Sequence, residues 1–418
     1  MKGPLTLLLM LATSGASAQT PTQYTLADLQ RLALESHPAL QMAAAATASA
    51  TGNAEQAGAW MNPTIGYTAD EVRPGGVIRG GEHGFFVEQV IPLGSKLRLQ
   101  REALLGSQHV AEADAAAVRA RVLAGVGAAY AGVLAADERL AARTRLSELL
   151  REGVTVSQQL YNVGAADRPD LLEAEAEATR MTLAMTRAAL ARDDAWMALA
   201  VAVGRPDLPR LPVDGSLREL PRLDERASVH QAIVDGNPGV RTARARLAET
   251  EARLTSAQRV TAPELVVRGG FLYNRELFER APGGDSRAVG WEGSAEVGVR
   301  VPLWNRNGGG TAAARAEVDL ARGALRLAEQ RLERQFSQVW TAREEAAASA
   351  AAYAQEVLPR AEEAYRLYLA RYREMAVAYP NVLLARRSLL DATTEYVDAL
   401  ERGWRQTVQL QALLVAEE

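Results

Sequence analysis

Few residues in this chain could carry catalytic or metal chemistry. The sequence has no cysteine, so neither a thiolate metal site nor a disulfide framework is available. Its histidines (His37, His83, His109 and His230) are scattered, and none are spaced to put two imidazoles on one turn of helix. The Gly-rich run at Asn307 lacks the Lys-Ser/Thr pair of a phosphate loop. We therefore predict no enzyme, no bound metal and no cofactor.

Charged residues do recur at one regular spacing, in the segment that starts at Trp291. Polar side chains alternate there with apolar ones, and the pattern ends at Pro302. A period of two predicts a strand with one apolar and one polar face. No nucleophile and base accompany the polar set, so we interpret it as the lining of a barrel lumen: Glu292, Glu296 and Arg300.

Similar alternation predicts four strands, arranged as two hairpins. They cover about 63–72, 84–91, 264–274 and 290–301. About ten residues is the length that a tilted strand needs to cross a bilayer. The segments Arg73–Glu82 and Arg275–Val289 are rich in Gly, Pro and charge and are predicted as hairpin loops. Soluble hairpins packed on helices are the alternative.

The elements around these strands are long helices, and their order occurs twice. A helix from Thr25 to about Ala59, capped by Thr25 and Asp28, precedes the first hairpin, and Ser228 is expected to cap its counterpart. Rods are predicted from Lys96 to about Glu152 and from Asn307 to about Arg373, with a return from Asp167 to Val203. The fold class is therefore mainly α with a transmembrane β part, internally duplicated. Residues 19–204 and 227–418 form the two repeats, and the Pro-rich segment 205–226 links them.

The N-terminus predicts export. A short basic region, an apolar run and the small residues Ala16-Ser17-Ala18 make residues 1–18 a signal peptide, with no cysteine for lipid attachment. No other segment looks apolar for long enough to span a membrane as a helix, so insertion would require the strands. Four strands cannot close a membrane barrel, and an open edge is not tolerated in lipid. Several copies must therefore share one barrel.

Two turns between rods carry a family resemblance. The first reads Tyr161-Asn-Val-Gly164 followed by Asp170-Leu-Leu-Glu-Ala174, and the second runs from Tyr372 to Ala385. With the duplicated hairpins, these turns resemble the TolC-like outer-membrane efflux protein family over essentially the whole mature chain. The run Val301-Pro-Leu-Trp-Asn-Arg-Asn307 is most similar to its CzcC-type heavy-metal branch.

The resemblance implies a homotrimer with a twelve-stranded barrel in the outer membrane and a helical tunnel in the periplasm. It also implies a periplasmic adaptor and an inner-membrane pump of the resistance-nodulation-division type as partners, with heavy-metal cations as cargo. Multidrug efflux or type I protein secretion by the same kind of channel remains open. A periplasmic adaptor or a structural coiled coil is a more distant alternative, because neither explains the strands.

The resemblance assigns adaptor docking to the tips of the two turns, at about 161–170 and 372–381. Because Met375 replaces the glycine of the first tip, a different turn geometry is expected at the second. The docking candidates are Val163, Gly164, Ala165, Met375, Ala376 and Val377.

The residues just past each tip match the acidic aperture of the family. Asp170 and Glu173 keep the charge in the first repeat, whereas Asn381 and Leu384 carry none in the second. The alternative for both acids is ordinary helix N-terminal charge, which the helix dipole favours.

Overall fold

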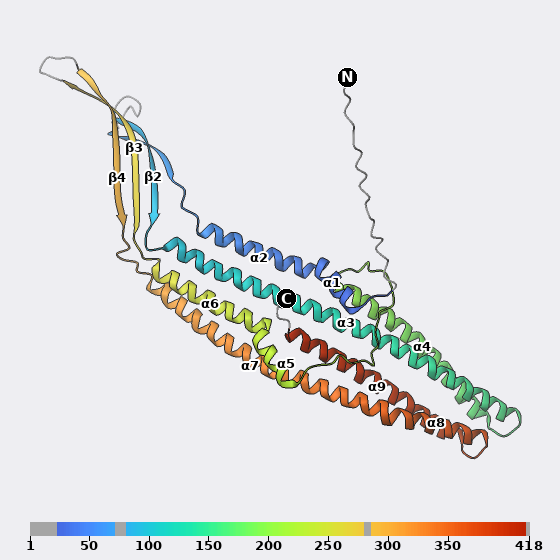
Figure 1. Cartoon of the computed structure of the whole chain (residues 1–418). Helices are drawn as coiled ribbons and strands as arrows, with labels where there is room; N and C mark the ends of the chain where they lie inside the picture. The colour runs from blue at the N-terminus through green and yellow to red at the C-terminus, as the bar shows by residue number, and fades with distance from the viewer. Residues whose placement is uncertain (1–22, 72–80, 280–285, 415–418) are drawn as a thin grey trace, which may run out of the picture.

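The molecule is long, with a small β-sheet at one end and helices along the rest (Figure 1). The computed structural model describes residues 23–71, 81–279 and 286–414. The expected signal peptide 1–18 and nearly all of the expected loop 73–82 lie outside the described residues. The first half contains α1 (Leu26–Ser36), α2 (Pro38–Ala57), β1 (Thr64–Asp70), β2 (Glu82–Pro92), α3 (Lys96–Asn162) and α4 (Arg168–Val203).

The second half repeats this order. It contains α5 (Arg226–Gly236), α6 (Pro238–Arg259), β3 (Glu264–Glu279), β4 (Ser286–Arg300), α7 (Gly308–Ala352), a π-helical turn (Tyr353–Val357), α8 (Leu358–Arg373) and α9 (Tyr379–Leu414). The chain is thus mainly helical with one antiparallel sheet.

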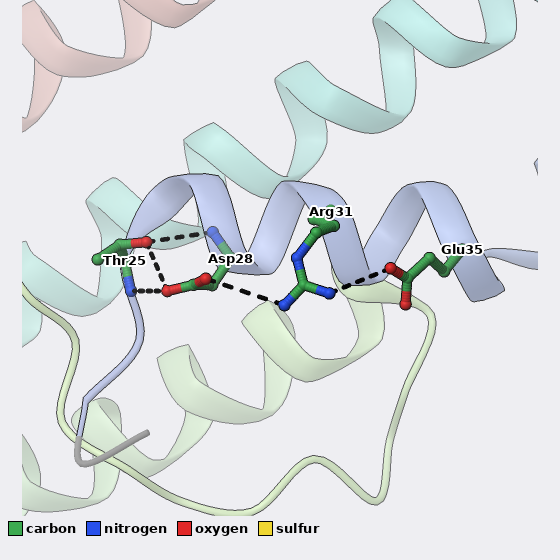
Figure 2. A network of polar contacts seen from close by, with 4 residues as sticks. All are labelled: Thr25, Asp28, Arg31 and Glu35. Carbon is green, nitrogen blue, oxygen red and sulfur yellow. Dashed lines mark hydrogen bonds and ion pairs between the residues drawn. The ribbon is translucent and has the colours of Figure 1, made fainter. Parts of the chain in front are cut away.

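The first helix begins where the sequence predicts. Thr25 Oγ1 accepts a hydrogen bond from the Asp28 backbone N–H at 3.1 Å, and the Thr25 N–H donates to the Asp28 carboxylate at 3.3 Å. This reciprocal capping box is followed by Arg31, whose guanidinium reaches Glu35 at 3.2 Å (Figure 2). The counterpart expected at Ser228 is wrong, because α5 starts at Arg226 with no side-chain cap.

Each expected N-terminal helix is in fact two helices. The first breaks at His37, which has extended ψ (125°) ahead of Pro38, and the second breaks in the same way at Asn237. A residue before proline is disfavoured in the helical region, so the chain turns and a new helix starts on the proline. The Asn237 side chain caps the new helix by accepting from the Val240 N–H at 3.1 Å.

The rods also differ from their expected bounds. Helix α3 continues past the expected end at Glu152 to Asn162. The second rod contains the π-helical turn Tyr353–Val357 just before Pro359. Proline lacks an N–H and crowds the preceding turn, so a wider turn at this point accommodates it. A window of α3 is apolar and long enough to cross a membrane by composition alone (mean hydropathy 1.3), contrary to expectation. Val126, Ala131 and Ala135 of this helix are fully buried, as in a core helix.

The sheet has the order β1-β2-β3-β4, all antiparallel. Strand β3 extends to Glu279 and strand β4 begins at Ser286, so most of the expected loop 275–289 is strand. A register shift between Asn274 and Leu277 interrupts the alternation there, which is why the sequence pattern did not reveal the extension.

The helices continue from the sheet as a wall of side-by-side elements. Next to the sheet, α2 packs on α3, α3 on α6 and α6 on α7; farther away, α4 packs on α3, α3 on α9, and α9 on α7 and α8. Figure 1 shows α2 and α4 along one side of the molecule and α7 and α8 along the other.

The linker 205–226 packs against the long helices in the region where their neighbouring helices change. Tyr24 pairs with Val213 in an isolated parallel bridge, and Trp404 Nε1 donates to the Leu217 carbonyl at 2.9 Å. Leu208 and Leu217 are buried in the largest apolar cluster, together with residues of α1, α3, α4 and α9. The linker is therefore part of the shared core of the two halves.

Candidate functional site: hairpin tips and strand lumen face

The first tip closes with a left-handed residue. Gly164 has φ 73°, its N–H donates to the Tyr161 carbonyl at 3.0 Å, and the Ala165 N–H reaches the Leu160 carbonyl at 2.8 Å. These bonds satisfy carbonyls at the end of α3. A Cβ on Gly164 would meet nothing within 4 Å, so glycine is favoured here by backbone conformation alone.

The second tip has the same geometry, and the expectation of a different turn is wrong. Met375 has φ 57°, its N–H donates to the Tyr372 carbonyl at 3.0 Å, and the Ala376 N–H reaches the Arg371 carbonyl at 2.9 Å. A left-handed non-glycine residue costs roughly 1 kcal/mol, which the hydrogen bonds that end the helix can offset. The Met375 side chain is 65% exposed, so tertiary packing does not hold it there.

The two tips lie together at the end of the molecule farthest from the sheet (Figure 1). The Ser157 and Tyr372 hydroxyls are 3.4 Å apart in a buried contact, and Arg373 forms an ion pair with Glu152. Of the expected docking residues, only Val377 is half-buried, and the rest are exposed. Val163, at 76%, is an apolar side chain almost wholly in solvent.

The four aperture candidates occupy the first two turns of α4 and α9. Asp170 is half-buried. Its burial and, to a smaller extent, the negative charges of Asp167 and Glu173 raise the pKa of its carboxyl group. Glu173 is exposed, as are Asn381 and Leu384. Leu384 is 70% exposed although it is apolar.

A buried ion pair next to the tips was not predicted. Arg386 Nη1 lies 2.6 Å from Glu177 Oε2, and their side chains are only 5% and 7% exposed. Glu177 also accepts from Arg180 at 2.6 Å. Burial alone would raise the pKa of Glu177, but the hydrogen bonds from Arg386 and Arg180 lower it overall. The pair joins α4 of one half to α9 of the other.

The sequence did contain a signal for this pair. Glu177 falls at helical spacing between the buried Ala174 and Met181, and Arg386 falls between the buried Val382 and Leu389. A charge at an apolar position of a helix needs a partner when it is buried. The tyrosines around the pair are buried too, and burial raises the pKa of Tyr365 to about 12.

The predicted lumen residues lie on one face of the sheet. Cross-strand pairing puts Glu292 opposite Leu272, Glu296 opposite Arg268 and Arg300 opposite Glu264. The Arg300 guanidinium lies 3.2 Å from Glu264, which also binds Lys96 at 3.1 Å. The Arg268 guanidinium stacks over the Phe86 ring at 3.7 Å.

The other face of the sheet is apolar and exposed to solvent in the single chain. Tyr67, Phe85 and Phe271 are aligned across three strands on this face. Its most exposed members are Ile65, Tyr67, Phe85, Val87, Phe271, Trp291, Val297 and Val299, all at least half exposed. In the described parts of the chain, no three His, Asp or Glu side chains are grouped so that they could hold a metal ion.

The same architecture, a long helical body with a small antiparallel sheet at one end, is found in a solved outer-membrane protein. The crystal structure of the outer membrane protein VceC from Vibrio cholerae superposes with a TM-score of 0.76 at 20% identity, covering 93% of this chain and 96% of that one. A profile of the outer membrane efflux protein family matches residues 29–205 and 229–415. The chain belongs to that family, which consists of transport conduits and not enzymes.

Two relatives are metal-resistance proteins. The cobalt-zinc-cadmium resistance protein CzcC of Cupriavidus metallidurans is 24% identical over 326 residues, which is 78% of this chain and 75% of CzcC. The nickel-cobalt-cadmium resistance protein NccC of Alcaligenes xylosoxydans xylosoxydans is 26% identical over 327 residues, which is 76% of this chain and 69% of NccC.

Proposed function

We propose that this chain is the outer-membrane channel of a tripartite efflux system that exports heavy-metal cations. Three copies would share a twelve-stranded barrel, and their helices would form a tunnel into the periplasm. A periplasmic adaptor and an inner-membrane pump of the resistance-nodulation-division type would complete the assembly. The observation that carries the proposal is the two-faced sheet, which has one face of exposed aromatic and branched side chains and one face of charges.

The strand count supports assembly from several copies. A lipid-facing sheet must leave no free edge, and β1 and β4 each have one side without a strand partner in the described chain. Four strands fall short of the roughly eight that the smallest membrane barrels contain. The number three comes from the family resemblance.

We assign roles to the site residues on the same basis. Glu292, Glu296 and Arg300 would line the barrel lumen, because they share the polar face of the sheet. The exposed tips, Val163–Ala165 and Met375–Val377, would receive the adaptor. Asp170, Glu173, Asn381 and Leu384 would line the narrowest point of the tunnel. Residues 1–18 would be cleaved on export, with no lipid attached.

The cargo proposal rests on CzcC and NccC, whose names specify divalent metals. Among the described residues no three His, Asp or Glu side chains are grouped as metal ligands, and a conduit for metal ions needs no such site. A deletion strain and its complemented parent, exposed to zinc, cobalt, cadmium and nickel beside dyes and antibiotics, would test the cargo. We expect the deletion strain to be selectively sensitive to the metals. Sensitivity to organic compounds alone would show that the cargo is drugs and not metal ions.

The barrel is tested by placing an arginine on the apolar face of the sheet in one variant and on the polar face in another. Val297 is 70% exposed on the apolar face, and Val266 lies on the polar face opposite Gly298. An arginine near the bilayer midplane costs about 2–4 kcal/mol in a membrane barrel. Val297→Arg should therefore abolish oligomers in the outer-membrane fraction, while Val266→Arg and Glu296→Gln preserve them. Equal tolerance of arginine on both faces would refute the barrel.

A further inference from the structure

The charges on the polar face of the sheet are not all paired. In the regular part of the register, up to Asn274, the acidic side chains of this face are Asp70, Glu82, Glu88, Glu264, Glu292 and Glu296, and its guanidiniums are those of Arg268 and Arg300. Arg300 binds the acid across from it, since its Nη1 lies 3.2 Å from Glu264 Oε2. Arg268 has an acid on each side in the register, Glu88 on β2 and Glu296 on β4. Side chains directly opposed on neighbouring strands are close enough to interact.

Within the described chain, Arg268 nevertheless pairs with neither of these acids. Its guanidinium stacks over the ring of Phe86, 3.7 Å from the ring centroid. Among the described residues, Glu88 and Glu296 take part in no ion pair, in contrast to Glu264, which binds Lys96 as well as Arg300. An exposed ion pair gains little in water, whereas a weakly hydrated guanidinium stacks well on an aromatic face. The stack therefore leaves both carboxylates beside Arg268 without a bound cation.

Two glycines give the Phe86 ring its place. Gly66 on β1 and Gly270 on β3 flank Phe86 in the register. A Cβ on Gly66 would lie 2.4 Å from Cζ of the ring, so the ring occupies the space that a side chain would take there. Arg268 is the diagonal neighbour of Phe86, a distance that long side chains span. The position of the guanidinium thus depends on the ring of Phe86 and on the missing side chain at Gly66.

We infer that Phe86 is a positioning residue that holds the Arg268 guanidinium against the wall of the barrel, so that Glu88 and Glu296 face the ions in the lumen. This inference deepens the proposed function and rests on it, since the polar face is a lumen only in a closed barrel. Rings of carboxylates favour cations in channels, and a wall of one charge raises the local concentration of counter-ions. Without the ring, the guanidinium would bind the two acids and screen them. Phe86 thus sets the charge preference of the barrel although it carries no charge.

The ion selectivity of the purified full-length chain in planar lipid bilayers tests this role. The ratio of K⁺ to Cl⁻ permeability follows from the reversal potential across a KCl gradient. Phe86→Leu removes the aromatic face and should lower this ratio at least twofold, whereas Phe86→Tyr keeps the face and should retain the ratio of the parent. The acids near the hairpin tips are the same in every variant, so their contribution to selectivity is common to all of them.

Two glycine substitutions on the polar face form a matched pair. Gly66→Ala places a Cβ where the ring lies and should displace the ring, so the permeability ratio should fall as it does in Phe86→Leu. Gly298→Ala adds the same methyl group to the same face, opposite Val266, where nothing lies within 4 Å. This control should leave the ratio unchanged.

Removing the guanidinium separates positioning from packing. In an Arg268→Gln background there is no cation to hold, so Phe86→Leu should have no further effect on the permeability ratio. An equal loss in both backgrounds would overturn the inference, because Phe86 would then act only through the shape of the wall. A Phe86→Leu variant with the ratio of the parent would overturn it as well. A parent chain that forms no ion-conducting pore would refute the proposed channel itself.

Discussion

The two hairpin tips have the same backbone and different chemistry. Gly164 and Met375 hold the same left-handed conformation, and the residue after each donates to a carbonyl at the same place in the preceding helix. The residues that follow differ in charge: Asp170 and Glu173 in the first half correspond to Asn381 and Leu384 in the second. The turn is therefore determined by how a helix end satisfies its carbonyls, while the side chains around it have diverged.

The same divergence produced an interaction that neither half could form with a copy of itself. The counterpart of Arg386 in the first half is Glu175, and the counterpart of Glu177 in the second half is Ser388. Both counterparts, Glu175 and Ser388, are exposed. The buried ion pair between Glu177 and Arg386 thus takes one partner from each half and ties the two hairpins together near their tips.

Breaking this pair should have the largest effect. Arg386→Met keeps the length of the side chain but leaves the Glu177 carboxylate buried, with only the largely exposed Arg180 as a partner. Removing one partner of a buried pair costs about 3–5 kcal/mol, and we expect the lower end because Arg180 remains. The midpoint of thermal unfolding, followed by circular dichroism, should fall clearly.

Two controls make this test specific. Glu175→Ala changes the exposed counterpart in the first half and should leave the midpoint within experimental error. Adding Glu177→Leu to Arg386→Met removes the orphaned charge and should restore most of the lost stability. If Arg386→Met were as harmless as Glu175→Ala, the pair would not stabilise the contact between the hairpins.

Exchanging residues at the two turns should have a smaller effect on thermal stability, and the effect should have opposite signs in the two halves. Gly164→Ala forces a Cβ into the left-handed region and should cost about 1 kcal/mol, since no neighbour adds a clash. Met375→Gly relieves the same strain and should gain about 0.5 kcal/mol, after the added freedom of glycine in the unfolded chain is subtracted. Thermal midpoints of the two variants that shift in the same direction would show that the tips are not equivalent.

The duplicated, mainly helical fold with its antiparallel sheet could be predicted because its signals are local and repeated. Three such signals depend only on residues that are close together in the sequence: the strand alternation around Val297, the capping box at Thr25 and the turn at Gly164. The breaks at His37 and Asn237 were equally local, and the proline after each could have revealed them.

The remaining features depended on hydrogen bonds and pairings that residue types alone do not specify. Met375 in a left-handed turn contradicts residue preference, because hydrogen bonds from its helix end override it. The extension of β3 and β4 past Asn274 is hidden by a register shift that only the paired strand reveals. The partner of Arg386 lies in the other half of the chain, so the sequence could flag an anomalous charge there but could not pair it.

The smallest effect concerns charge at the first tip. Burial and the neighbouring carboxylates of Asp167 and Glu173 raise the pKa of Asp170 above its ordinary value of 3.8. The folded chain therefore disfavours the ionised form, so its stability falls as the pH rises from about 3.8 through the raised pKa. Asp170→Asn gives the first tip the residue of the second. It should raise the thermal midpoint near neutral pH, and the gain should disappear as the pH falls toward 3.8.

The reverse exchange sharpens the comparison. Asn381→Asp places a carboxylate at the second tip, where the positions matching Asp167 and Glu173 are Ala378 and Leu384. With no acidic neighbours at these positions, the new carboxylate should titrate closer to its ordinary value and change the thermal midpoint less than Asp170→Asn does. A gain from Asp170→Asn that stayed constant from neutral pH to below 3.8 would mean that the benefit comes from the amide and not from removing charge. The acidic character of the first tip would then have no cost in stability, and the two tips would differ in their surface chemistry alone.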